Sequence, residues 1–90
     1  MRFALMCQDK PGHLEVRKAN RDAHLAYIKN TAVVEMAGPL LNDNGDMAGS
    51  LIILEVNDLD AAQTWARNDP YNKVGLFASV TLSAWNKVIG

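Results

Sequence analysis

The order of the predicted strands and helices constrains the fold of this chain more than any other feature of its sequence. The segment 42–46, Asn-Asp-Asn-Gly-Asp, has the composition of a hairpin loop, so the apolar segments on either side of it are expected to pair directly as strands. A strand and then a helix are expected before this hairpin, and a helix and then a strand after it. The expected elements are a strand at 2–8, a turn at 9–12, a helix at 13–30, strands at 31–41 and 50–56, a helix at 58–68 and a strand at 76–85.

This order, βαββαβ with a central hairpin, is the split βαβ or ferredoxin-like arrangement of the α+β class. It predicts an antiparallel four-stranded sheet that carries both helices on one face. Ninety residues suit one small domain, residues 1–90, of modest stability. Asp58 is expected to cap the second helix, whose buried side should consist of Leu59, Ala62, Trp65 and Ala66.

Apolar residues at consecutive positions, in segments 3–7, 32–34 and 51–54, indicate that both faces of the inner strands need cover. The two helices can cover only one face. A second copy of the chain packing on the open sheet face would cover the other, which predicts a two-fold homodimer with a barrel-like core. The alternative is that these short strands tolerate a half-exposed apolar face.

Helical spacing places a histidine and two arginines on one stripe of the first helix. Arg17 and Arg21 precede His24 by seven and three positions, which at about 100° per residue brings all three to one side. We expect this side to face away from the apolar positions, which are Val16, Ala19, Ala23, Ala26 and Tyr27. A titratable imidazole beside two fixed cations suits proton transfer next to an anionic ligand, but the same stripe could be a solvated helix face.

The segment Asp69-Pro70-Tyr71 supplies a second candidate group. An aspartate before a proline is a natural N-cap for a short helical turn, which is the structural interpretation of Asp69. Its carboxylate could also reach His24, which would set the tautomer of the imidazole and raise the basicity of the other ring nitrogen. The two interpretations are compatible. Tyr71 is expected to pack, and its hydroxyl would need a partner if it is buried.

Two glycine-containing segments complete the candidate substrate-binding residues. Gly38-Pro39 interrupts a strand and indicates a bulge or a sheet edge, where backbone groups stay free. Gly49 would let another backbone or a ligand approach closely, although it could also be a plain strand start. Ser50 has no recognisable base, so we interpret it as a hydrogen-bond donor and not as a nucleophile. With Tyr71, these residues could contact a small ligand.

Several classes of function are disfavoured by composition. A formal net charge of −1 without a basic run argues against nucleic acid, and the apolar run at 1–8 is too short for a signal peptide or a membrane span. The single cysteine, Cys7, is expected to pack inside a strand, and we expect a cytoplasmic protein. His13 and His24 lack the spacing of metal ligands, and no cofactor motif is present, so we expect neither metal nor cofactor.

Four short motifs, in this order and spacing, resemble those of the YCII-related domain family. They are Arg21-x-x-His24-Leu25-x-Tyr27, Ala37-Gly38-Pro39-Leu40, Gly49-Ser50-Leu51, and Asp69-Pro70-Tyr71 with Gly75-Leu76-Phe77. The resemblance covers nearly the whole chain. It implies a ferredoxin-like protomer in a dimeric α+β barrel and an active site around a histidine and an aspartate, here His24 and Asp69. For some relatives it implies a place in aromatic degradation, with dehydrochlorination of a chlorinated hydroxyquinone.

These observations favour a small enzyme, a lyase or isomerase that needs no cofactor. In this hypothesis His24, oriented by Asp69, transfers a proton on a small cyclic or carboxylated substrate, aromatic-derived compounds included. Arg21 and Arg17 would stabilise negative charge on the substrate. One alternative is a non-catalytic dimer that binds a small anionic metabolite. Another is an accessory protein in which His24 only belongs to a polar network.

Overall fold

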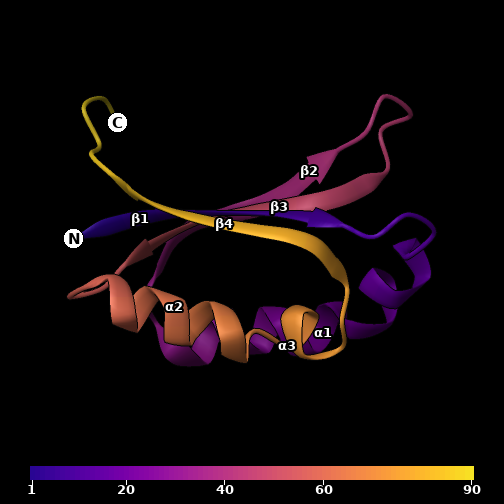
Figure 1. Ribbon diagram of the computed structural model, residues 1–90, viewed down its shortest axis with the longest axis horizontal. Coiled ribbons are helices and arrows are strands. Elements are labelled where there is room, and N and C mark those ends of the chain that lie inside the picture. Colours follow the sequence, from indigo (N-terminus) through magenta and orange to yellow (C-terminus); the bar gives the residue numbers. More distant parts are fainter.

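In the computed structural model, which describes residues 1–90, three helices cover one face of a four-stranded antiparallel sheet (Figure 1). The elements are β1 (Arg2–Asp9), α1 (Leu14–Thr31), β2 (Val34–Leu41), β3 (Met47–Glu55), α2 (Leu59–Asn68), α3 (Pro70–Lys73) and β4 (Phe77–Trp85). The strands lie in the order β2-β3-β1-β4, which is that of the ferredoxin-like arrangement. The predicted fold class is therefore confirmed. None of the helices combines the length and the hydrophobicity needed to cross a membrane.

The hydrophobic core lies between the two central strands and the helices. Because successive side chains of a strand point to opposite faces, every second residue of β1 and β3 turns toward the helices. The register pairs Phe3 with Leu54 and Leu5 with Ile52, and all four side chains are buried. The central strands thus supply the floor on which the helices pack.

Helix α2 begins as the sequence predicts, and three of its four expected core residues are buried. The Asp58 side chain accepts a hydrogen bond from the backbone N–H of Ala61 at 2.8 Å, so it caps the helix. Ala62, Trp65 and Ala66 are buried. The expectation for Leu59 was wrong, since this side chain is 46% exposed. Helical side chains lean toward the N-terminus, so the first residue of a helix extends past its end.

Helix α1 continues through Thr31, so the following strand begins at Val34 and not at 31 as expected. The hydroxyl of Thr31 donates to the carbonyl of Tyr27 at 2.8 Å and accepts a hydrogen bond from the indole of Trp65 at 2.9 Å. The helix ends at Ala32, which adopts the left-handed conformation with φ of 56°. A β-branched residue that favours strands is held in the helix by these contacts.

Pro39 lies on β2, which is an edge strand of the sheet. An edge tolerates a residue without an N–H group, so the edge interpretation of Gly38-Pro39 is confirmed. The bulge interpretation is wrong at this position, because the shifts in register with β3 fall between Val34 and Met36 and between Leu40 and Leu41.

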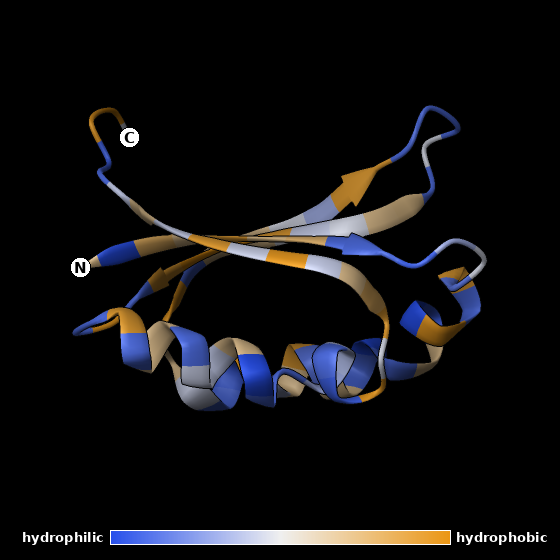
Figure 2. Cartoon of the chain, in the orientation of Figure 1, coloured by the Kyte–Doolittle hydropathy of each residue, from blue (hydrophilic) through white to orange (hydrophobic).

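No element of the chain covers the sheet face opposite the helices (Figure 1), and hydrophobic residues are frequent in the middle of the sheet (Figure 2). Met6, Met36 and Leu51 alternate with residues that face the helices, and all three are exposed on this open face. Toward β4 the face becomes polar, with Ser79, Thr81 and Ser83. The expected apolar surface is therefore present and lacks cover within one chain.

Gly49 gives a test of the packing between β1 and β3. A Cβ added at this residue would overlap the backbone carbonyl oxygen of Cys7, whereas one added at Gly38 would meet nothing within 4 Å. We expect Gly49→Ala to lower the free energy of unfolding by about 1–3 kcal/mol, as overpacking does. Gly38→Ala, the control, should be neutral or stabilising by up to about 1 kcal/mol. Equal losses of stability in urea denaturation of the two variants would contradict this account.

Candidate active site

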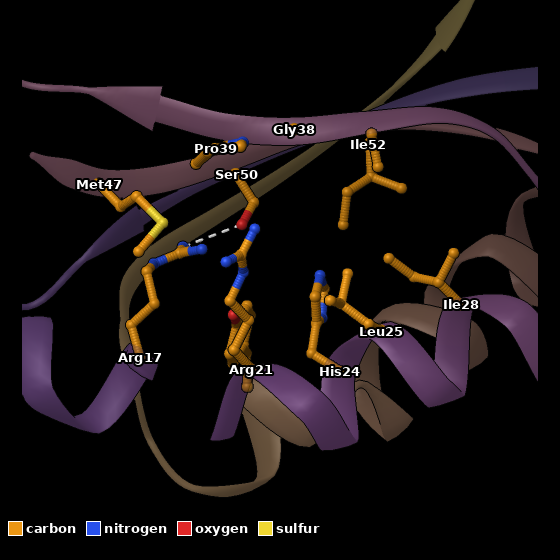
Figure 3. A pocket seen from close by; sticks show the side chains of 12 residues that line it. Arg17, Arg21, His24, Leu25, Ile28, Gly38, Pro39, Met47, Ser50 and Ile52 are labelled. Carbon is orange, nitrogen blue, oxygen red and sulfur yellow. Dashed lines mark hydrogen bonds between the residues drawn. The ribbon is translucent and has the colours of Figure 1, made fainter. Parts of the chain in front are cut away.

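A pocket of about 110 Å³ lies between α1 and the hairpin formed by β2 and β3 (Figure 3). Its polar lining comprises Arg17, Arg21, His24, Ser50 and Tyr71. Its apolar lining includes Leu25, Ile28, Pro39, Met47 and Ile52. An engineered cavity of about 150 Å³ is known to hold benzene, so this pocket has the scale of one small ring or a small acid.

The side of α1 that carries Arg17 and His24 faces the sheet, which decides between the two alternatives that the sequence left open for this stripe. These two side chains are only 3% and 6% exposed, whereas Ala19, Ala23 and Ala26 are exposed. Burying polar groups costs little free energy when each one has a partner, and burying an alanine methyl gains little. Arg17 and His24 therefore form part of a site wall, whereas Arg21 on the same stripe is exposed.

His24 and Asp69 meet beneath the pocket, 45 residues apart in the sequence. The imidazole Nδ1 lies 2.7 Å from the carboxylate Oδ1, and Asp69 is 1% exposed. An ionised carboxylate only accepts hydrogen bonds, so this contact suits donation from Nδ1–H to Asp69, the tautomer in which Nε2 carries the lone pair. Nε2 makes no hydrogen bond in the protein, and Figure 3 shows the ring extending from α1 into the pocket.

Asp69 also caps α3, as its position before a proline suggested. Its Oδ1 accepts a hydrogen bond from the backbone N–H of Tyr71 at 3.0 Å. The second carboxylate oxygen, Oδ2, is buried and has no hydrogen-bond partner. The buried carboxylate therefore depends on His24 as its one side-chain partner, which makes this contact costly to break.

Tyr71 holds the imidazole in place through its ring. The ring centroids of Tyr71 and His24 are 3.9 Å apart at an interplanar angle of 14°, which is a stacked arrangement. The guanidinium carbon of Arg17 lies 4.6 Å from the centre of the same tyrosine ring. Burial raises the pKa of the Tyr71 hydroxyl, and the opposing effect of Arg17 and Arg21 is smaller. The phenol therefore stays protonated at neutral pH.

Arg17 is not free to bind a ligand charge, because it is paired with Asp9. Its Nε and Nη2 donate to the two carboxylate oxygens of Asp9 at 2.7 and 2.9 Å, and Nη2 also donates to Ser50 Oγ at 2.9 Å. Burial acts to lower the pKa of Arg17, but Asp9 and, to a smaller extent, Tyr71 together raise the pKa above its ordinary value. The sequence showed Asp9 only as a turn residue, because no periodic rule links a strand end to the following helix.

Arg21 is the one pocket cation without a partner. It lines the pocket, is exposed, and makes no ion pair or hydrogen bond within the protein. Gly38 and Pro39 line the pocket as well, on the side of β2. Gly49 does not, because the backbone of β1 at Cys7 occupies the space beside it. Gly49 was expected to allow the close approach of either a backbone or a ligand, and in the structure a backbone approaches it.

Cys7 lies outside the pocket, in the buried core. Burial raises the pKa of its thiol to about 12, so almost no reactive thiolate is present at neutral pH. Histidine, cysteine, aspartate and glutamate side chains do not gather in groups of three or more anywhere in the chain in a way that could hold a metal ion.

Comparisons with known proteins extend this description. The sequence model of the YCII-related domain family matches residues 1–86 of this chain. Protein YciI of Escherichia coli O6:H1 (strain CFT073) is 36% identical in an alignment of 97 positions that covers 98% of this chain and 99% of that protein. The structure of 5-chloro-2-hydroxyhydroquinone dehydrochlorinase (TftG) from Burkholderia phenoliruptrix AC1100, in complex with 2,5-dihydroxybenzoquinone, is 38% identical with a TM-score of 0.87. That similarity covers 96% of this chain and 94% of the TftG chain.

A more distant neighbour shares the fold alone. The crystal structure of an antibiotic biosynthesis monooxygenase has a TM-score of 0.61 at 10% sequence identity, and the similarity covers 98% of both chains. Fold similarity at this level carries no information on chemistry. The family model, by contrast, spans nearly the whole chain, and the chain has full-length relatives above 30% identity. The protein belongs to the YCII-related domain family.

Proposed function

We propose that the protein is a small enzyme in which His24, oriented by Asp69, transfers a proton on a small cyclic or carboxylated substrate. The observation that carries this proposal is the 2.7 Å contact between Nδ1 and the buried carboxylate, with Nε2 left free on the pocket side. A neutral imidazole held in one tautomer is suited to act as a general base and then as a general acid. The reaction would be of the lyase or isomerase type.

Each polar group has a distinct part in this mechanism. Nε2 of His24 accepts a proton from the substrate, and the imidazolium that forms is stabilised by the Asp69 carboxylate. Negative charge develops on the substrate as the proton leaves. Arg21 faces the same pocket without a partner and is the cation available to stabilise that charge. Arg17 acts only indirectly, since its charge is paired with Asp9.

An aromatic-derived substrate is the most specific form of this proposal. The pocket volume of about 110 Å³ suits a single ring. TftG, similar over nearly the full length, is a dehydrochlorinase of a chlorinated hydroxyhydroquinone and holds 2,5-dihydroxybenzoquinone. Loss of HCl requires a base for the proton while chloride departs, and His24 would be that base.

The experiment that tests this proposal is an assay of chloride release from 5-chloro-2-hydroxyhydroquinone by the purified protein. We expect a chloride electrode to record chloride release faster than the spontaneous rate. A panel of small cyclic acids, followed by NMR for exchange or isomerisation, extends the search to other substrates. The competing function is a binding protein for small anions. If the His24→Ala variant still binds ligand and the native protein turns over no compound in the panel, the protein is a binding protein and not an enzyme.

We also propose that the protein works as a homodimer in the cytoplasm. The apolar side chains of Met6, Met36 and Leu51 lie on the sheet face that no helix covers, and a second copy offers the same surface in return. Two such sheets packed face to face would remove these side chains from water. The lone cysteine, Cys7, is buried and unpaired, as expected for a chain in a reducing compartment.

The oligomeric state of Leu51→Glu tests the dimer. We expect light scattering to give twice the chain mass of 9.9 kDa for the native protein and a monomer for this variant, because a buried unpaired carboxylate opposes association. Leu59→Glu is the matched control, since Leu59 is exposed at the start of α2 on the side of the helices. A monomeric native protein, or a Leu51→Glu variant that remains dimeric, would contradict this arrangement.

A further inference from the structure

The hydroxyl of Ser50 is half-satisfied in a buried position. Ser50 lies on β3, is 2% exposed and lines the pocket. Its Oγ accepts a hydrogen bond from Nη2 of Arg17 at 2.9 Å. The same hydroxyl donates to no group of the protein. A buried donor without an acceptor is unfavourable, so the hydroxyl is available to an acceptor that enters the pocket.

Arg17 determines the direction in which this hydroxyl can donate. A guanidinium has only donors, so the lone pair of Ser50 must face Arg17 and the O–H proton must point elsewhere. Arg17 cannot turn away, because two hydrogen bonds tie it to Asp9 and it is almost fully buried. The Asp9–Arg17 pair thus keeps Ser50 in the role of a donor toward the pocket.

A second donor reaches the same region from α1. Arg21 is one helical turn beyond Arg17, and Figure 3 shows its side chain extending from the helix toward the strand that carries Ser50. Its guanidinium has no acceptor in the protein. A fixed hydroxyl donor and an unpaired guanidinium that face one pocket are suited to an oxygen atom with negative charge.

We propose that Ser50 and Arg21 form a subsite for an ionised oxygen on a planar ring, such as a phenolate or an enolate, with Arg17 as the positioning residue. The ring itself would lie against the apolar wall that includes Ile28 and Ile52. This inference uses the pocket of the proposed function and adds the class of ligand and its orientation. It concerns binding, so it can be tested without turnover.

Calorimetric binding of two ring compounds of similar size tests the subsite. The anionic probe is 2,5-dihydroxybenzoquinone, whose acidic hydroxyls ionise below neutral pH, and the neutral probe is hydroquinone. We expect the native protein to bind the anion more tightly than hydroquinone. Arg21→Met and Ser50→Ala should each weaken binding of the anion by about tenfold or more, since each variant removes a charge-assisted hydrogen bond. Hydroquinone binding should change far less. Ser50→Thr, which keeps the hydroxyl, should retain the preference.

Arg67→Met is the matched control, because it removes the same charge from a residue whose only side-chain hydrogen bond is to Thr64, outside the pocket. It should leave both affinities unchanged. If Arg21→Met weakens the anion no more than Arg67→Met does, or if the anion does not bind the native protein, the subsite is wrong. Arg21 is exposed and unpaired, so this variant carries the test even if Ser50→Ala fails to fold. If the protein prefers the anion but turns over no substrate, the proposed subsite is supported and only the proposed proton transfer by His24 is wrong.

Discussion

Replacement of His24 by glutamine is expected to lower the rate of chloride release, or of any other reaction found in the assays, by about 10³-fold, the range typical of a lost general base. The glutamine amide retains an N–H donor for the buried Asp69 carboxylate, and urea denaturation of the variant measures whether the fold keeps its stability. The side chain offers no basic nitrogen toward the pocket. Steady-state kinetics and calorimetric binding measured on the same preparation separate the loss of turnover from a loss of affinity.

His13→Gln is the matched control for this variant. His13 is the other histidine of the chain, lies outside the pocket, and contacts only the backbone carbonyl of Pro11 through Nδ1. Its replacement should leave the rate unchanged. A His24→Gln protein that turns over substrate at the native rate would show that the imidazole is not the base, whatever the substrate is.

The second large effect is expected on stability, from Arg17→Met. The Asp9 side chain is 6% exposed and both of its oxygens accept from Arg17, so the variant leaves a buried carboxylate without its cation. Removing one partner of a buried ion pair lowers the free energy of unfolding by about 3–5 kcal/mol. This is a large part of the 5–15 kcal/mol that typically separates folded from unfolded proteins. Urea denaturation of the native and variant proteins measures the difference.

Two further variants separate this explanation from a general loss of charge. Lys18→Met removes a cation whose pair with Glu15 is exposed at 3.7 Å, and it should cost at most about 1 kcal/mol. The double variant Asp9→Leu with Arg17→Met removes both buried charges and should recover most of the lost stability. A single Arg17→Met variant as stable as Lys18→Met would mean that the buried pair contributes little.

Much of the fold could be predicted because the signals act over short distances. The Asn and Gly residues of 42–46 form the hairpin loop, and Asp58 and Asp69 cap the helices that follow them. Each of these signals concerns backbone groups within four residues, whose geometry is nearly independent of the rest of the chain. The ends of α1 and β2 were less predictable, because Thr31 is held in the helix by a hydrogen bond from Trp65.

The candidate site was predictable in its residues and not in its arrangement. Helical spacing and the Asp-Pro pair singled out His24 and Asp69, which do meet at 2.7 Å. The same spacing placed Arg17, Arg21 and His24 on one polar side of α1, but it did not decide whether that side would meet the sheet or solvent. Which face is buried depends on whether the polar groups find partners, and the partner of Arg17 comes from the end of β1.

By itself the sequence determined the kind and order of the elements, the caps of α2 and α3, and the residues from which a site could be made. These depend on local backbone preferences and on apolar periodicity. The tertiary structure alone decided that α1 buries Arg17 and His24, that Asp9 neutralises Arg17, and that Arg21 remains the free cation. The physical reason is that the free energy of a buried charge depends on the group that meets it in space, and local sequence does not specify that group.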